Sequence, residues 1–176
     1  MAGLFSKKEK KYILTDKVWM TEAGKFRALI SEKIKDPSLV IICWFPATLE
    51  KLSLLAEQPD SFAWLASSLH AAVIAGKKII FAEHFPLPAR EKEFMERYQL
   101  TKAETWTSLD EPLMLLFGGE KIAGMMKNLG MDENSPLEHT MITKSIHNAQ
   151  DKISKKATTE LSAHSAAEWL KNNLPS

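Results

Sequence analysis

The feature that most constrains the fold is an uninterrupted apolar run, LVIICWF, at residues 39–45. The run is rich in β-branched residues, and Pro46 follows it directly. A short run of this kind is typical of a β-strand that is buried on both faces. Strands of that type occur in parallel sheets, because helices cover each side of such a sheet. The run therefore predicts a parallel sheet between layers of helix.

Strand-like and helical segments alternate along the rest of the chain. Strands are expected at residues 12–20, 39–45, 78–84 and 103–109. Helices are expected at residues 21–35, 48–55, 61–76, from Pro88 onward, at 110–117, as a pair within 117–155, and at 161–174. Alternation of this kind favours helices packed on a parallel sheet. The predicted fold class is α/β, with three layers, a mostly parallel sheet of about four strands and a C-terminal helical extension.

Apolar residues at helical spacing predict which face of each helix is buried. Thr21 is the expected N-cap of the first helix, and Glu22 lies in its first turn, where the helix dipole favours an acidic residue. The predicted buried residues are Ala23, Phe26, Ile30 and Ile34 in the first helix, Leu49, Leu52 and Leu55 in the second, and Phe62, Leu65, Leu69 and Val73 in the third.

Residues 117–155 have the pattern of two helices joined by a turn. Gly130 is expected to end the first helix, and residues 135–138 form a capping box with proline at the first helical position of the second. The second helix is expected to bury a stripe made by Ile142, Ile146, Ala149 and Ile153. This stretch predicts a helical hairpin.

A second set of residues in this hairpin carries a resemblance to a known family: Gly124, Met125, Met126, Leu129, Gly130, Met131, Leu137, Glu138, His139, Thr143, Lys144, Ile146, Asn148, Ala149 and Gln150. In type and order these residues resemble one part of SecA, the motor of bacterial preprotein translocation: the second motor domain and its junction with the helical scaffold. Further matches are residues 18–22, Lys25 and Phe26, Glu50 and Lys51, and Leu113, Met114 and Phe117. The resemblance covers most of residues 16–55 and 104–156. It implies a fold like the second lobe of a P-loop NTPase or helicase.

The resemblance also indicates what this chain lacks. The SecA motor uses a Walker A loop in its first motor domain, and no G-x-x-x-x-G-K-[ST] occurs here. In the family, the second motor domain supplies arginines that meet the γ-phosphate, but neither of its arginine motifs is present in this chain. The expected function is therefore a non-catalytic interaction module that has lost ATPase activity. The matched hairpin residues are expected to be mostly packing and capping residues, among them Met125, Met126 and Leu129.

An alternative function is the binding of a small ligand or nucleotide at the carboxyl edge of the sheet. Ligands of open parallel sheets bind beyond the carboxyl ends of the strands. The candidate residues there are Trp44, Phe45, Glu83, His84 and Phe85. Glu83 and His84 could serve acid–base chemistry, although adjacent strand residues point to opposite faces. The competing interpretation is that the last helix covers these aromatic residues with Trp169 and Leu170.

Composition excludes several other classes of function. The net charge is +1, from 23 basic and 22 acidic residues, so no nucleic-acid partner is expected. The single cysteine, Cys43, is expected to be a buried apolar group, and the five histidines lack metal-ligand spacing. His139 and His147 are eight residues apart and do not converge on one helix. No metal, cofactor or catalytic residue is predicted.

The predicted organisation has three parts: a flexible tail at 1–11, a SecA-like α/β domain at 12–130, and a helical extension at 131–176 that packs on it. The lysine-rich tail is not expected to hold the chain on a membrane, since four lysines attract anionic lipid weakly. No apolar run approaches the roughly 20 residues of a membrane span. A cytoplasmic protein that binds another protein or itself is the expectation.

Overall fold

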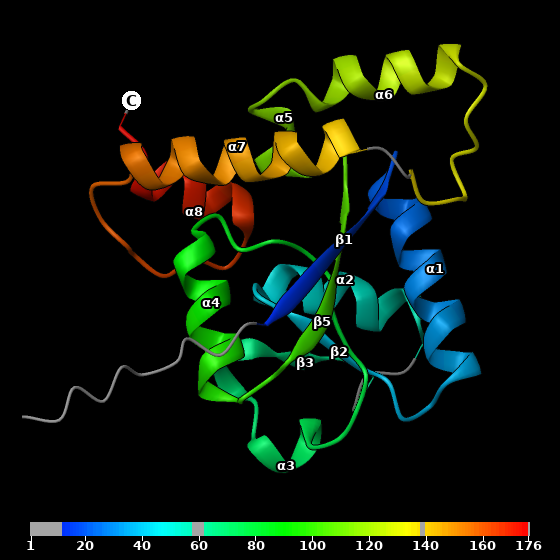
Figure 1. Ribbon diagram of the computed structural model, residues 1–176, viewed down its shortest axis with the longest axis vertical. Helices are drawn as coiled ribbons and strands as arrows, with labels where there is room; N and C mark the ends of the chain where they lie inside the picture. Colours follow the sequence, from blue (N-terminus) through cyan, green and yellow to red (C-terminus); the bar gives the residue numbers. More distant parts are fainter. Residues whose placement is uncertain (1–11, 58–61, 138–139, 176) are drawn as a thin grey trace, which may run out of the picture.

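Within the described residues, five parallel strands form the centre of the molecule, in the order β1-β5-β4-β2-β3 (Figure 1). The computed structural model describes residues 12–57, 62–137 and 140–175. The strands are β1 (Ile13–Trp19), β2 (Val40–Cys43), β3 (Trp64–Leu65), β4 (Ile79–Phe81) and β5 (Lys102–Ser108). The helices of the sheet domain are α1 (Glu22–Lys35), α2 (Pro46–Leu55), α3 (Ala71–Ile74) and α4 (Pro88–Arg97), with a 3-10 turn at Ala66–Ser68. The predicted α/β class and parallel sheet are confirmed.

Helices cover both faces of the sheet. Helices α1 and α2 pack on one face, over a core that includes Trp19, Phe26, Leu29, Ile41 and Ile80. Helix α4 covers the other face, where Phe94 and Met95 meet Val40, Ile79 and Phe81. The two sets of strand residues alternate along β2 and β4, because successive strand side chains point to opposite faces. The molecule therefore has the three layers of a P-loop or helicase-like fold.

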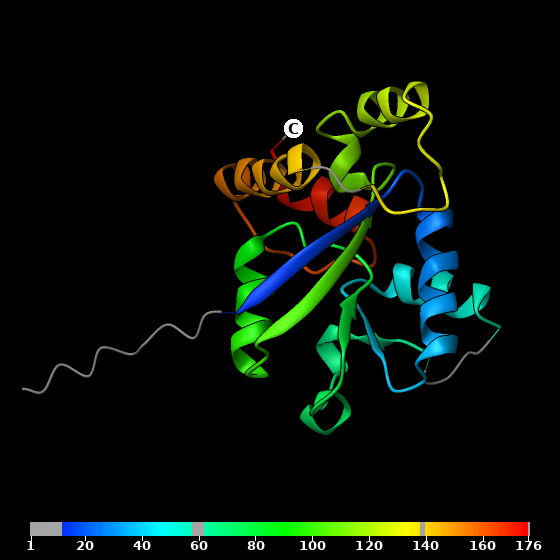
Figure 2. The ribbon, with the colours of Figure 1, turned by 45° about the vertical axis from the view of Figure 1, so that its right-hand side comes forward.

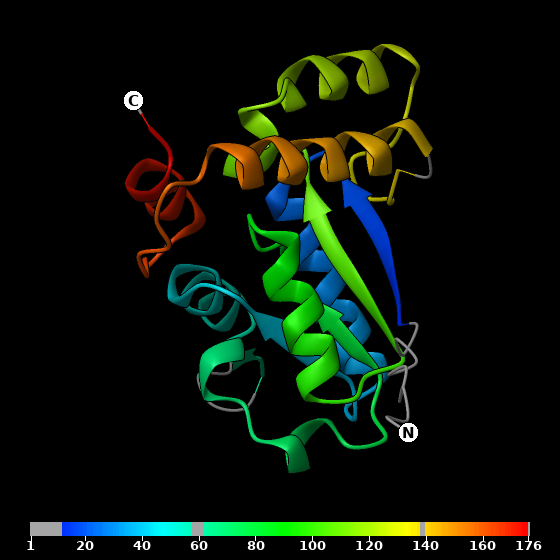
Figure 3. The ribbon, with the colours of Figure 1, turned by 60° about the vertical axis from the view of Figure 1, so that its left-hand side comes forward.

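A further group of helices lies across the carboxyl ends of the strands. These are α5 (Pro112–Leu115), α6 (Gly119–Asn128), α7 (Thr140–Lys156) and α8 (Ala166–Asn173). In Figure 3 the strand β5 ends directly beneath α7, and α8 lies beside α7 over the same end of the sheet. The buried stripe of α7 is the predicted one, Ile142, Ile146, Ala149 and Ile153. Trp169 of α8 is only 1% exposed, so the last helix covers this edge.

Helix α6 is the outermost element of this group, and a long connection leads from it back toward the end of β1 (Figure 2). Gly118 and Gly130, with φ of +87° and +74°, begin and end the helix in conformations that favour glycine. At Gly119 a Cβ atom would lie 2.0 Å from the carbonyl oxygen of Leu109, so only glycine fits there. The expected end of this helix at Gly130 is confirmed.

Several expected elements are wrong in detail. Residues 61–76, expected as one helix, contain β3, the 3-10 turn and the four-residue α3, so the sheet has a fifth strand. Helix α7 begins at Thr140 and not at Pro136, because Leu137 is extended and its N–H donates to the carbonyl of Val18 at 2.6 Å. Residues 161–165, expected in the last helix, precede α8, which Ser165 caps.

The predicted buried face of α1 is also partly wrong. Thr21 is the N-cap, as expected, and its hydroxyl accepts a hydrogen bond from the N–H of Gly24. Phe26 is buried, but Ala23 and Ile34 are exposed, and Lys25 and Leu29 are buried instead. Leu55 of α2 is likewise exposed. The burial of a lysine within α1 has a specific cause at the carboxyl edge of the sheet.

Candidate functional site

The five predicted site residues lie together at the carboxyl edge, because β2 and β4 are neighbouring strands. They divide between two cavities. Trp44 and Phe85 line a cavity of about 490 Å³ beside α4, whereas Glu83 and His84 line one of about 210 Å³ beneath the first turn of α8. Phe45 is buried against Phe85, with ring centroids 5.5 Å apart, and lines neither cavity. The sequence therefore predicted that these residues lie at one edge of the sheet, but not that they line two separate cavities.

Glu83 holds the connection between β2 and α2. Its Oε1 accepts hydrogen bonds from the backbone N–H groups of Trp44 at 3.0 Å and Phe45 at 3.1 Å. Its Oε2 accepts from the hydroxyl of Thr48 at 2.6 Å. Burial raises the pKa of Glu83 to about 7, against the opposing effect of these hydrogen bonds. Both carboxylate oxygens are engaged within the chain.

A buried ion pair lies beside Glu83, between Lys25 of α1 and Glu111, which precedes α5. The Nζ of Lys25 contacts Glu111 and donates to the carbonyl oxygen of Ala82 at 2.5 Å. Glu111 also accepts from the hydroxyl of Thr107 at 2.6 Å and from the N–H of Ser108 at 3.1 Å. Lys25 is 0% exposed, so the pair fixes α1 to the ends of β4 and β5 from inside.

This ion pair was not predicted from the sequence. One sequence signal for a polar contact was available. Glu111 follows the end of β5, and Glu83 follows the end of the neighbouring strand β4, so both lie at the carboxyl edge of the sheet. The partner was harder to find because Lys25 lies 86 residues away along the chain. A lysine beside Phe26 in an amphipathic helix is ordinarily solvated.

His84 lies between two carboxylates from different elements. Its Nδ1 is 2.8 Å from an oxygen of Glu91 in α4, and its Nε2 is 3.1 Å from an oxygen of Asp16 in β1. Burial alone would lower the pKa of His84, but Glu91 and Asp16 outweigh it and raise the pKa to about 10. The imidazole is therefore a buried cation near neutral pH.

The contact between His84 and Asp16 is an ion pair without hydrogen-bond alignment. The carboxylate oxygens of Asp16 have no directed donor in the described part of the chain. His147 of α7, which is 60% exposed, has its Nε2 at 3.4 Å from Asp16. Gln150 of α7 donates to the carbonyl of Phe85 at 2.8 Å and to Glu91 at 3.2 Å. Glu83 and His84 thus have separate partners, as expected for adjacent residues.

Metal ligation has no support in these polar clusters. Among the described residues, no group of three or more histidine, cysteine, aspartate or glutamate side chains is placed to hold a metal ion. Cys43 is buried, and burial raises the pKa of its thiol. His139, one of the residues that match SecA, lies outside the described residues with its neighbour Glu138.

The matched hairpin residues have two different environments. Met126, Ala149 and Gln150 are buried. Asn148 is exposed, and Gly124 has open space where a Cβ would lie. Met125 and Leu129 were expected to pack, but they are 57% and 71% exposed. The apolar side chains through which α6 packs on the rest of the molecule are instead Ile122, Ala123 and Met126.

The fold and edge geometry define a class: an all-parallel, three-layer α/β domain of the P-loop or helicase-like type. Comparison with known proteins shows to which proteins part of the chain is related. About 50 residues of the chain are homologous to the protein translocase subunit SecA. The identity is 53% over 51 residues for the SecA of Pelotomaculum thermopropionicum, 50% over 48 for that of Acidithiobacillus ferrooxidans and 47% over 51 for that of Carboxydothermus hydrogenoformans.

The aligned stretch is a small part of both this chain and the SecA proteins. It covers 27–29% of this chain and 5–6% of those relatives. The chain therefore contains a SecA-like segment, and it matches only about one-twentieth of the length of the curated relatives. No protein-family model matches the chain. Within the described residues, no helix is long and apolar enough to cross a membrane.

Proposed function

We propose that this chain is a non-catalytic protein-interaction module related to SecA, and that its partner is a subunit of a protein translocase. The observation that carries the proposal is the exposure of Met125 on α6 and of Leu129, the C-cap of the same helix. These two residues are four apart, so they lie on one face of the helix. We call this pair the α6 face.

Exposed apolar side chains are concentrated in the part of the chain that contains the α6 face. Of the eleven large hydrophobic side chains found exposed in the described part of the chain, six lie within residues 115–141. The six are Leu115, Leu116, Met125, Leu129, Met131 and Met141. Single exposed hydrophobic residues are ordinary, but a concentration of them is a mark of interaction surfaces. Methionine suits such a surface because its side chain adapts to different partners.

The polar groups of the carboxyl edge support a non-catalytic function. Glu83 and Glu111 have both oxygens engaged by donors within the chain. The sequence contains no Walker A loop. We therefore expect the chain by itself to release no phosphate from ATP above the buffer rate, and a colorimetric phosphate assay would test this. Release that disappears in the Glu111→Gln variant would contradict the proposal.

The nature of the partner is inferred from the relatives. They are named as subunits of a protein translocase, so a translocase subunit is the proposed partner, and the cytoplasm is the proposed location. On the same proposal, residues 12–130 form the SecA-like domain and residues 131–176 a helical extension of it. The four helices at the carboxyl edge would then present the interaction surface.

Affinity purification of the full chain from cells that produce it tests the proposal, with quantitative mass spectrometry of what is retained. The test variant is Met125→Ser with Leu129→Ser. The matched control is Leu54→Ser, because Leu54 is an apolar side chain that is 79% exposed on α2. We expect a translocase subunit to be retained by wild type and control and lost with the double variant. Equal retention by all three would overturn the proposal, as would recovery of a second copy of the chain only.

Ligand binding at the carboxyl edge is a second candidate function. The cavity of about 490 Å³ beside α4 favours it, because cavities of roughly 300–1,000 Å³ are the usual size of small-molecule sites.

A further inference from the structure

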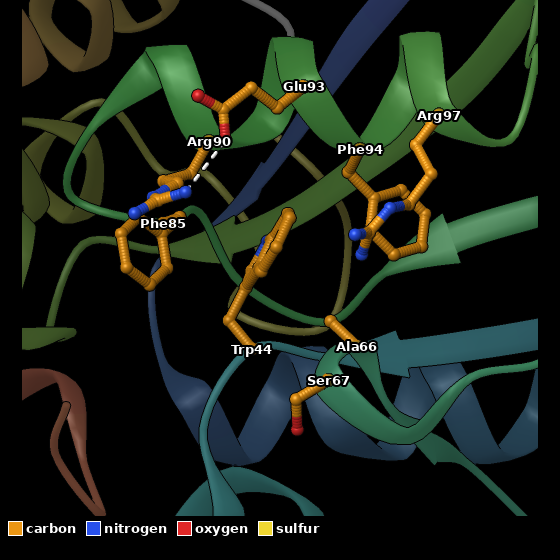
Figure 4. A pocket seen from close by; sticks show the side chains of 8 residues that line it. All are labelled: Trp44, Ala66, Ser67, Phe85, Arg90, Glu93, Phe94 and Arg97. Carbon is orange, nitrogen blue, oxygen red and sulfur yellow. Dashed lines mark hydrogen bonds and ion pairs between the residues drawn. The ribbon is translucent and has the colours of Figure 1, made fainter.

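The larger cavity opens between α4 and the residues that follow β2, β3 and β4. It is lined by Trp44, Ala66, Ser67, Phe85, Arg90, Glu93, Phe94 and Arg97 (Figure 4). In Figure 4, Trp44 stands between Phe85 and Phe94, and the two arginine side chains extend from α4 toward these rings. The cavity thus combines an aromatic wall with a cationic rim.

The aromatic wall is held together by contacts between rings. Trp44 stacks on Phe81, with ring centroids 5.3 Å apart and planes within 6°. Phe85 and Phe94 meet Trp44 edge-on, at 5.4 Å each. The indole of Trp44 is only half-buried, so part of it remains accessible. Because three rings hold it, a flat ligand could pack on it without prior rearrangement.

The cationic rim is unusual for this chain, which has only three arginines. Arg90 and Arg97 are seven residues apart in α4, so they lie on the same side of the helix. Arg90 is already paired, with Glu93 at 2.7 Å and with Glu160. Arg97 makes no ion pair with any described residue. Its guanidinium therefore has donors available at the cavity.

A hydroxyl group lies across the mouth from Arg97. Ser67 belongs to the 3-10 turn after β3, and its side chain is exposed. The neighbouring Ser68 bonds to the carbonyl of Leu65, whereas Ser67 has no hydrogen-bond partner among the described residues. A guanidinium fork and a hydroxyl together suit a carboxylate or a phosphoryl group.

We propose that this cavity binds a small planar aromatic anion, its ring packed on Trp44 and its carboxylate or phosphoryl group held by Arg97 and Ser67. Glu93 sits at the same rim, so a ligand with several negative charges would be repelled. The site therefore favours one acidic group over a polyphosphate. This binding is separate from the α6 face, since it uses α4 and the ends of β2 and β3.

Titration of the full chain, followed by amide and indole shifts in two-dimensional NMR, tests this proposal. The probes are indole-3-acetate, adenosine monophosphate and inorganic phosphate. We expect saturable binding of at least one aromatic probe, with shifts at Trp44. Binding of the first alone assigns a carboxylate ligand, and binding of the second alone a phosphoryl ligand. Arg97→Gln should weaken binding at least about tenfold.

The matched control is Arg27→Gln, because Arg27 is the third arginine and lies on α1, where it bonds to Asn134. This variant should leave the affinity unchanged, and the amide spectrum of Arg97→Gln reports whether the variant is folded. Three results would overturn the proposal: no saturable binding of either aromatic probe, equal loss in the Arg27 control, or binding of inorganic phosphate as tight as that of adenosine monophosphate.

Discussion

Met125 and Met126 are neighbours in the chain and about 100° apart around the axis of α6, but only Met126 faces the core. Met126 is 8% exposed and packs among Val18, Leu109 and Ile146, whereas the side chain of Met125 is 57% exposed. Leu129 continues the exposed side one turn later. This division separates residues that hold α6 in place from residues that are available to a partner.

The two sides of α6 should respond differently to substitution. Met126→Ala should lower the free energy of unfolding by about 2 kcal/mol, because it removes buried apolar atoms and leaves a cavity. Met125→Ser and Leu129→Ser should change it by less than about 0.5 kcal/mol, as is usual for surface positions. Urea denaturation followed by circular dichroism measures each value. Equal losses at positions 125 and 126 would mean that Met125 packs within the chain.

The Lys25–Glu111 pair should be costly to break from one side. Lys25→Met leaves Glu111 buried without its cation, and we expect a loss of about 3 kcal/mol in the free energy of unfolding. Adding Glu111→Gln to Lys25→Met should recover part of this loss, because the uncompensated charge is removed. A double-mutant cycle in urea measures the coupling. Strict additivity of the two single changes would show that the pair is not coupled.

Glu83 should make the protein less stable as the pH rises. Its pKa is raised from 4.5 to about 7 in the folded state, so the folded chain holds a proton that the unfolded chain has released. Stability should therefore fall between about pH 4.5 and 7, by a total on the order of 3 kcal/mol, and then level off. Glu83→Gln should lack this decline. Parallel stability curves for the two proteins would contradict the assignment.

The contribution of His84 to stability should be lost in a separate and higher pH range. Its pKa is raised from 6.5 to about 10, so its contribution to stability is complete below pH 6.5 and is lost as the pH rises through about 10. His84→Gln should destabilise the fold by about 3 kcal/mol at neutral pH, because Asp16 and Glu91 lose the buried cation between them. The control is His147→Gln, whose exposed ring should matter little. A variant of His84 as stable as the control would contradict this account.

The sequence predicted the framework of this fold because local signals carried it. The apolar run that became β2, the Thr21 cap and the stripe of α7 are each set by residues close together in the chain. The strand β3 was missed because Trp64 and Leu65 form only two sheet residues within a helix-like apolar spacing. The predicted start of α7 was wrong because Leu137 pairs with Val18, a contact that no local pattern encodes.

The candidate site was predictable in position but not in chemistry. The apolar runs and the prolines after them placed Trp44, Phe85 and Glu83 at one edge. The Lys25–Glu111 pair and the ion pairs of His84 depend on side chains that are far apart in the chain. The exposure of Met125 was equally hidden, since an amphipathic pattern does not tell whether a second apolar side has a partner within the same chain.

The most direct test of the interaction surface is site-specific photo-crosslinking in living cells. A photoreactive amino acid would replace Met125, and in a matched control it would replace Leu54, which is also exposed and apolar. Adducts would be identified by mass spectrometry. We predict a discrete adduct with a translocase subunit from position 125 and none from position 54. Absence of any adduct at position 125, or the same adducts from both positions, would contradict this prediction.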